Sequence, residues 1–95
     1  MWVKITHMGE TVKHLLFGSQ IRAARALLRW SAVDLANASS VGANTIRRAE
    51  VEDGILSMTA ANQRAVRQAL EGAGIQFIDQ NGGGPGVRLR KRCMD

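Results

Sequence analysis

The sequence predicts an all-α domain of four or five short helices that ends in a small C-terminal β-hairpin. Three observations lead to this fold class. Apolar residues recur at helical spacing through residues 19–71, serine or threonine precedes several of these segments, and aromatic residues make up only 4% of a chain that is 45% hydrophobic. Small aliphatic side chains let helix axes approach closely, which favours packed helices over a β-sandwich.

The first clear helical pattern covers residues 19–30, where Ser19 is in a position to cap the helix. An apolar stripe runs along it, formed by Ile21, Ala24, Leu27 and Leu28. A cationic edge follows at similar spacing, formed by Arg22, Arg25 and Arg29. These arginines either face solvent or contact phosphate groups, and the pattern leaves both readings open.

Two shorter helices follow, separated by a turn at residues 38–42. Ser31 is the predicted cap of the first, because Asp34 stands three residues later and favours the positive end of a helix. Leu35 and Ala36 are its inward residues. The second short helix covers residues 43–50, with Ile46 and Ala49 facing the core.

The last helix is expected to begin after Thr59 and to run to about residue 71, where Gly72 and Gly74 end it. Its expected buried side is formed by Ala61, Ala65, Val66, Ala69 and Leu70. Beyond it, the apolar run at 75–78, the glycine-rich turn at 82–86 and the alternating run at 87–90 predict a β-hairpin.

The chain therefore divides into a weakly ordered leader at residues 1–18, a helical domain at 19–73, and a hairpin with a basic tail at 74–95. Its apolar runs are shorter than the ~20 residues of a membrane span, and we expect a cytoplasmic protein with no membrane partner. Cys93 is the single cysteine, so no internal disulfide can form. His7 and His14 have no neighbouring catalytic or metal-binding set, and we expect neither enzymatic activity, nor a metal, nor a cofactor.

The chain is basic, with 13 lysines and arginines against 8 acidic residues and a formal charge of +5. An anionic partner follows from this balance, nucleic acid first and a membrane surface second. The excess of positive charge is unevenly distributed along the chain. Residues 19–56 hold five arginines against four acids, whereas the excess lies in Arg64, Arg67 and the run from Arg88 to Arg92.

Two short helices joined by a tight turn meet the physical requirement for placing one helix in the major groove of DNA. Residues 19–90 resemble the phage-repressor-like helix-turn-helix family, which includes Cro, lambda repressor and the xenobiotic-response-element regulators. The matching residues are Arg25, Leu28, Trp30, Ser31, Leu35, Ala36, Val41, Thr45, Ile46, Arg48, Glu50 and Gly54. Two positions depart from the pattern, because Ser40 stands at the usual glycine of the turn and Gly42 at the usual serine or threonine cap.

The resemblance implies a repressor-like domain that binds double-stranded DNA in a sequence-specific way, as a homodimer. In this docking mode the start of the helix at 43–50 meets the base edges. Asn44 suits adenine, Arg48 suits guanine, and Ala43 suits a thymine methyl group, whereas Arg47 is turned toward a phosphate. The remaining candidate DNA contacts are Thr45, Ser31, Arg22, Arg88 and Arg90.

Two rival functions stay open at this point. In the first, an antitoxin-like or anti-activator protein uses the same domain mainly to bind a protein partner. In the second, the basic hairpin binds RNA, although Phe77 is its only aromatic residue available for base stacking. For the homodimer, we expect the strand at 75–78 and the face of Val87 and Leu89 to form the contacts, since a short apolar strand needs a covering surface.

Overall fold

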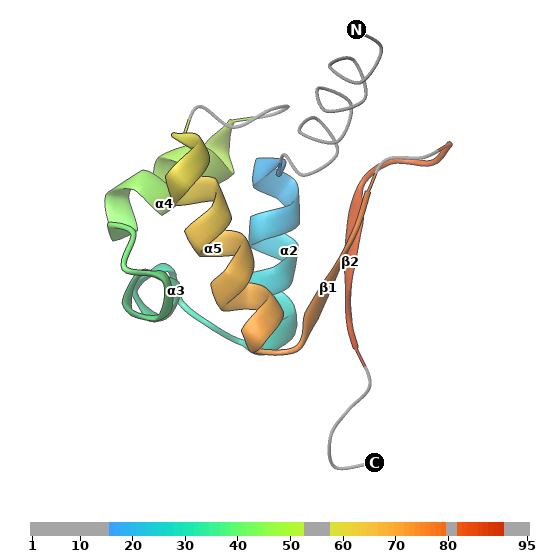
Figure 1. Cartoon of the computed structure of the whole chain (residues 1–95), viewed down its shortest axis with the longest axis horizontal. Coiled ribbons are helices and arrows are strands. Elements are labelled where there is room, and N and C mark those ends of the chain that lie inside the picture. The colour runs from blue at the N-terminus through green and yellow to red at the C-terminus, as the bar shows by residue number, and fades with distance from the viewer. Residues whose placement is uncertain (1–15, 53–57, 80–81, 91–95) are drawn as a thin grey trace, which may run out of the picture.

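A computed structural model describes residues 16–52, 58–79 and 82–90 of the chain. These residues form four helices and one antiparallel pair of strands: α2 (Gly18–Leu28), α3 (Ala32–Ser39), α4 (Ala43–Val51), α5 (Ala60–Gly72), β1 (Ile75–Ile78) and β2 (Gly86–Leu89). Figure 1 shows three layers, with α3 and α4 on one side, α2 and α5 in the middle, and the hairpin on the other side. The predicted mainly α-helical fold with a C-terminal hairpin is confirmed.

Two of the three predicted helix caps are confirmed. The hydroxyl of Ser31 accepts a hydrogen bond from Asp34 N at 3.0 Å, and the hydroxyl of Thr59 accepts one from Asn62 N at 3.1 Å. Ser19 is not a cap. Helix α2 begins one residue earlier, after Phe17, because the Gln20 side chain accepts a hydrogen bond from Phe17 N at 2.9 Å.

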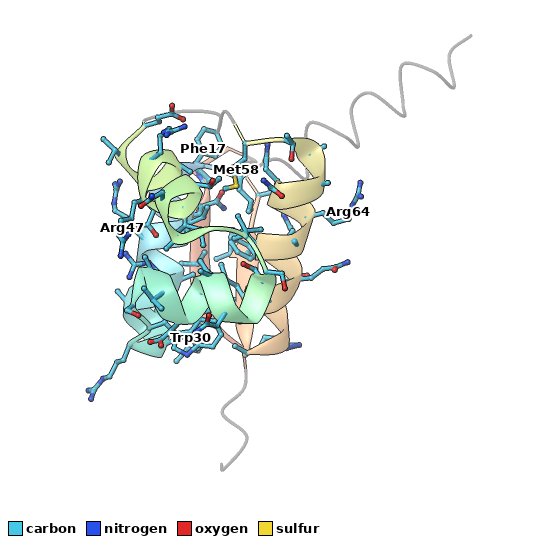
Figure 2. All side chains as sticks on the ribbon, turned by 90° about the vertical axis from the view of Figure 1, so that its left-hand side faces the viewer. Phe17, Trp30, Arg47, Met58 and Arg64 are labelled. Carbon is cyan, nitrogen blue, oxygen red and sulfur yellow. The ribbon has the colours of Figure 1, made fainter. Side chains whose placement is uncertain are left out.

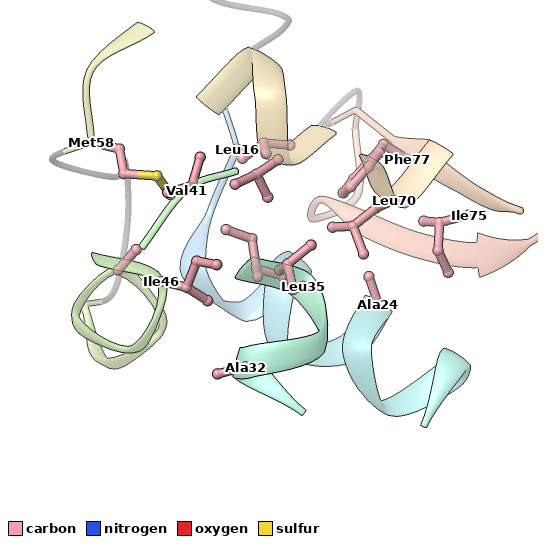
Figure 3. Close-up of a cluster of buried hydrophobic side chains, with 13 residues drawn as sticks. Leu16, Ala24, Ala32, Leu35, Val41, Ile46, Met58, Leu70, Ile75 and Phe77 are labelled. Carbon is pink, nitrogen blue, oxygen red and sulfur yellow. The ribbon is translucent and has the colours of Figure 1, made fainter. Parts of the chain in front are cut away.

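One hydrophobic core joins all the elements (Figure 3). Its largest fully buried side chains are Leu16, Ile21, Leu35, Ile46, Val66, Leu70 and Ile75. Leu16 was expected to be loosely packed in the leader, and that expectation is wrong. Its side chain is buried, and its backbone N–H donates to the carboxamide oxygen of Gln63 at 3.2 Å.

Two predicted core positions face outward. Leu27 is 42% exposed, and Ala61 is exposed at the start of α5. The cause at Leu27 is the arrangement of neighbours, because α2 packs against α4 on one side and against β2 on another. Helical spacing predicts that a residue shares a face with its neighbours, but not how wide the covered part of that face is.

The hairpin packs onto the helices through its inner face. Ile75 pairs with Leu89 and Phe77 with Val87, and the side chains of Ile75 and Phe77 are buried in the core of their own chain. The Arg67 guanidinium lies 4.9 Å from the centre of the Phe77 ring, a cation–π contact that covers this ring further. The side chains of Ile75 and Phe77 are therefore not available for the dimer contacts that the sequence predicted.

The turn between α3 and α4 contains a strained position at Ser40, where the sequence departs from the usual glycine. Ser40 ends α3 in the left-handed region, with φ 64° and ψ 24°. A side chain there is unfavourable, and only glycine adopts this conformation freely.

Replacing Ser40 with glycine is expected to raise the free energy of unfolding by about 0.5–1 kcal/mol. Chemical denaturation of the two proteins measures this difference. The same exchange at Ser31 is the control, and it should cost stability because the cap to Asp34 N is lost. A destabilised Ser40→Gly variant would contradict the assignment of strain to this turn.

Candidate nucleic-acid interface

Helix α4 presents one exposed arc to solvent, which is polar apart from Val51. Ile46 and Ala49 are buried as predicted, and Ala43 and Thr45 are half-buried. The exposed residues of the helix are Asn44, Arg47, Arg48 and Val51. With about 100° of rotation per residue, Arg47 and Arg48 stand at the two edges of this arc, and Asn44 lies between them.

The helix before α4 holds it from one side. Helix α3 packs against both α4 and α5, and it buries Leu35 together with Ile46 (Figure 3). Val41 in the turn is 4% exposed and belongs to the same cluster. The short turn and this apolar contact fix how α4 leaves α3, which is the bracing role expected of the first helix of the unit.

An ion pair holds α4 from the other side. Nε of Arg25 on α2 lies 2.7 Å from Oε2 of Glu50 on α4, and its Nη2 lies 2.7 Å from Oε1. The Glu50 side chain is only 7% exposed, and Arg25 also donates to the Trp30 carbonyl at 2.8 Å. The hydrogen bonds that Arg25 donates to the Glu50 carboxylate raise the pKa of Arg25 above its ordinary value. Such a two-point contact fixes the rotation of α4 about its own axis.

The start of α2 and the end of α4 also touch through their backbones. A Cβ atom on Gly18 would lie 2.3 Å from the carbonyl oxygen of Ala49 and 2.8 Å from that of Glu52. Only glycine permits this approach. The position of α4 is thus set by three neighbours: α3, the Arg25–Glu50 pair and the backbone at Gly18.

Two further predicted contact residues, Arg22 and Ser31, lie beside α3 and α4, and each already has a hydrogen-bond partner. Arg22 is exposed on α2, and its guanidinium donates to the backbone carbonyl of Glu50. Ser31 is exposed at the start of α3, where its hydroxyl accepts the capping bond from Asp34 N. A serine hydroxyl that accepts one bond still has its own proton to donate, so the cap leaves Ser31 able to contact a phosphate.

The structure adds a hydrogen bond between two of the predicted recognition residues. The guanidinium of Arg47 donates to Asn44 Oδ1 at 3.3 Å, while Asn44 and Arg48, four residues apart, remain on one face of the helix. Within the part of the chain that the structure describes, Arg48 has no hydrogen bond or ion pair. Arg48 is therefore the arginine of α4 that is free to meet a ligand, and Arg47 is placed to orient Asn44.

The hairpin arginines lie away from α4. Arg88 donates to the Gln76 side chain at 3.0 Å, and Arg90 donates to the Glu71 carbonyl at 2.9 Å. The layer of α2 and α5 separates the hairpin from α3 and α4 (Figure 1). The structure thus does not bring Arg88 and Arg90 together with the other predicted contacts.

The roles of two residues that position the site, Gly18 and Arg25, were not predicted from the sequence. Gly18 was assigned to the leader, although a glycine just before a predicted helix could have signalled a close approach. Arg25 was placed on a solvent or phosphate edge, whereas it is bound to Glu50. The sequence carries no local signal for that pair, because its partners lie 25 residues apart.

No family model matches the chain, and no curated protein matches its sequence. Among the described residues, no helix is long and apolar enough to cross a membrane, and no cluster of histidine, cysteine and acidic side chains could hold a metal. The predictions for His7, His14, Gly54 and Cys93 fall outside the residues that the structure describes.

Proposed function

We propose that this chain binds double-stranded DNA in a sequence-specific way, with α4 as the recognition helix. The proposal rests on how firmly α4 is held and on which side chains it exposes. Its inner side is fixed by α3, by the Arg25–Glu50 pair and by the contact at Gly18, while its outer arc offers Asn44, Arg47 and an unpartnered Arg48. A rigid helix with exposed hydrogen-bonding groups is what reading base edges requires.

The hydrogen bond between Arg47 and Asn44 suits this role. The oxygen of a carboxamide has two lone pairs, so Asn44 can accept from Arg47 and from the amino group of an adenine together. Arg47 then keeps further N–H groups for a phosphate. Arg48, at the other edge of the arc, can form the paired contact to guanine. We further propose that the chain regulates transcription as a homodimer that represses by occupying its site.

Selection from random duplexes, followed by affinity measurements on the best site, tests the proposal. Arg48→Ala is expected to weaken binding to that site by about 1–3 kcal/mol, which is roughly 5- to 150-fold, and to relax preference at one base pair. Arg47→Ala is expected to weaken all sequences through the lost phosphate contact, which carries no sequence information. Because Arg47 also orients Asn44, the variant should in addition relax preference at the base pair that Asn44 contacts.

The matched control is Arg64→Ala. Arg64 is exposed on α5, without a hydrogen bond or ion pair among the described residues, and Figure 2 places it on a different side of the molecule from Arg47. Its loss should change affinity little. Equal effects of Arg48→Ala and Arg64→Ala would reduce the binding to general attraction between a basic protein and an acidic polymer. Stronger competition by single-stranded RNA than by duplex DNA would favour the RNA alternative.

A further inference from the structure

The outer edge of β2 is a second interaction surface. We infer that two copies of this chain pair through β2, edge to edge and antiparallel, with Val87 on the two-fold axis. The inference rests on the proposed function in one respect, since it supplies the homodimer named there. Its test uses no DNA, so the two can fail separately.

The hydrogen-bond pattern of the hairpin shows which backbone groups are free. Arg90 N donates to the Gly74 carbonyl at 2.7 Å. Gly74 and Arg90 are thus a hydrogen-bonded pair, and the pair of Ile75 and Leu89 is the next one along the ladder. In an antiparallel ladder, the pair next to a hydrogen-bonded pair turns its N–H and C=O groups outward. The peptide groups of Val87 and Leu89 therefore point away from β1, and within the described chain they have no hydrogen-bond partner.

The same rule turns the peptide groups of Ile75 and Phe77 outward on β1, but these residues are covered. Ile75 is 1% and Phe77 is 8% exposed, whereas Leu89 is 40% exposed and Val87 is half-buried. Among the described residues, the edge of β2 is therefore the one that a partner strand can approach. An accessible strand edge with unpaired backbone groups is a template for another strand.

Charge selects one register for two β2 strands. In one register, Val87 pairs with Leu89 of the second copy, and Arg88 then stands opposite Arg88 of that copy. Like charges directly opposite each other are unfavourable. In the other register, Val87 pairs with Val87 of the second copy, so Arg88 stands opposite Gly86 and Arg90 opposite Gly84. The partly exposed Leu89 then meets Pro85, and its N–H donates to the Pro85 carbonyl, a bond that does not need the N–H that proline lacks.

This pairing would orient both recognition helices in the same direction. The two-fold axis of an antiparallel strand pair in a continuous sheet is normal to that sheet. The helices cover one face of the hairpin, and α4 lies beyond them (Figure 1). Rotation about such an axis leaves both copies of α4 on the same side, which is the arrangement needed to contact one duplex with two-fold symmetry.

The surface of α2 beside β2 is suited to extend the contact. Gln20 faces the hairpin, since its amide donates to the Gly86 carbonyl at 3.1 Å. Leu27 and Ala23 follow Gln20 around the helix, and both are exposed and uncharged. Short strands alone bury little area, so this apolar margin adds to what a stable dimer needs.

Analytical ultracentrifugation of the full chain and of Leu89→Lys tests the inference. The parent is expected at twice its 10.3 kDa mass at micromolar concentration, and the variant at its single mass with an unchanged circular dichroism spectrum. Val33→Lys is the matched control, because Val33 is 48% exposed on α3, in the opposite layer, and it should stay dimeric. A monomeric parent, or a Leu89→Lys variant that stays dimeric, would overturn the inference.

Cysteine crosslinking tests the register and does not depend on how well the lysine variant folds. In a Cys93→Ser background, Val87→Cys should form a disulfide-linked dimer on mild oxidation, because directly paired residues lie within disulfide reach. Arg88→Cys should crosslink poorly. The reverse result would show the register that places the arginines opposite each other and would contradict the one inferred here.

Discussion

Replacing Gly18 with alanine is expected to lower the free energy of unfolding by about 3 kcal/mol. The new Cβ would lie 2.3 Å and 2.8 Å from two backbone carbonyl oxygens at the end of α4, so one helix has to move. For a chain of this size, the melting temperature should fall by more than about 10 °C. DNA affinity should fall as well, because the shift displaces α4.

Gly72→Ala is the control for this variant. Gly72 is the last residue of α5, and a Cβ there meets nothing within 4 Å. Alanine is the better helix former, so this exchange should raise stability by up to about 1 kcal/mol. If both alanine variants melt at the parent temperature, the close approach of α2 to α4 does not exist.

Replacing Glu50 with alanine is expected to lower the free energy of unfolding by about 3 kcal/mol. The carboxylate binds Arg25 at two points, and removing it leaves a guanidinium that is 22% exposed without its counter-charge. Because Arg25 keeps some contact with water, the loss should fall at the lower end of the range for buried pairs. Urea denaturation measures it.

The pair of Arg67 with Glu71 provides the comparison. Its atoms lie 3.0 Å apart, but the Glu71 side chain is 42% exposed, and Glu71→Ala should cost no more than about 0.5 kcal/mol. The double variant Arg25→Ala, Glu50→Ala should lose less stability than the sum of the two single variants. Additive losses would contradict a direct interaction between α2 and α4 through this pair.

Local chemistry explains which parts of the fold the sequence predicted. The caps at Ser31 and Thr59 and the alternation of apolar and charged residues in β2 each depend on residues within one turn or one hairpin. Such short-range patterns carry their own physical cause, and they place α3, α4 and α5 to within a residue or two.

The parts that sequence reasoning missed depend on contacts between distant segments. The start of α2 is fixed by Gln20, whose amide also reaches the hairpin carbonyl of Gly86. The outward position of Leu27 and the bond from Arg25 to Glu50 depend on which helices meet, and periodicity does not contain that information. For the same reason, sequence reasoning placed Arg88 and Arg90 of the hairpin among the candidate DNA contacts together with the residues of α4, although the fold puts the hairpin and α4 in different layers (Figure 1).

Amide chemical-shift changes on the protein test most directly whether α4 reads DNA. A labelled sample is titrated with the duplex that the random selection returns. If α4 is the recognition helix, the largest changes fall on its first turns, at Ala43, Asn44, Thr45 and Arg48, while the amides of β2 show no greater change than in a sample given unrelated DNA. Changes concentrated at Arg88 and Arg90, with α4 unaffected, would contradict the proposal that α4 reads DNA.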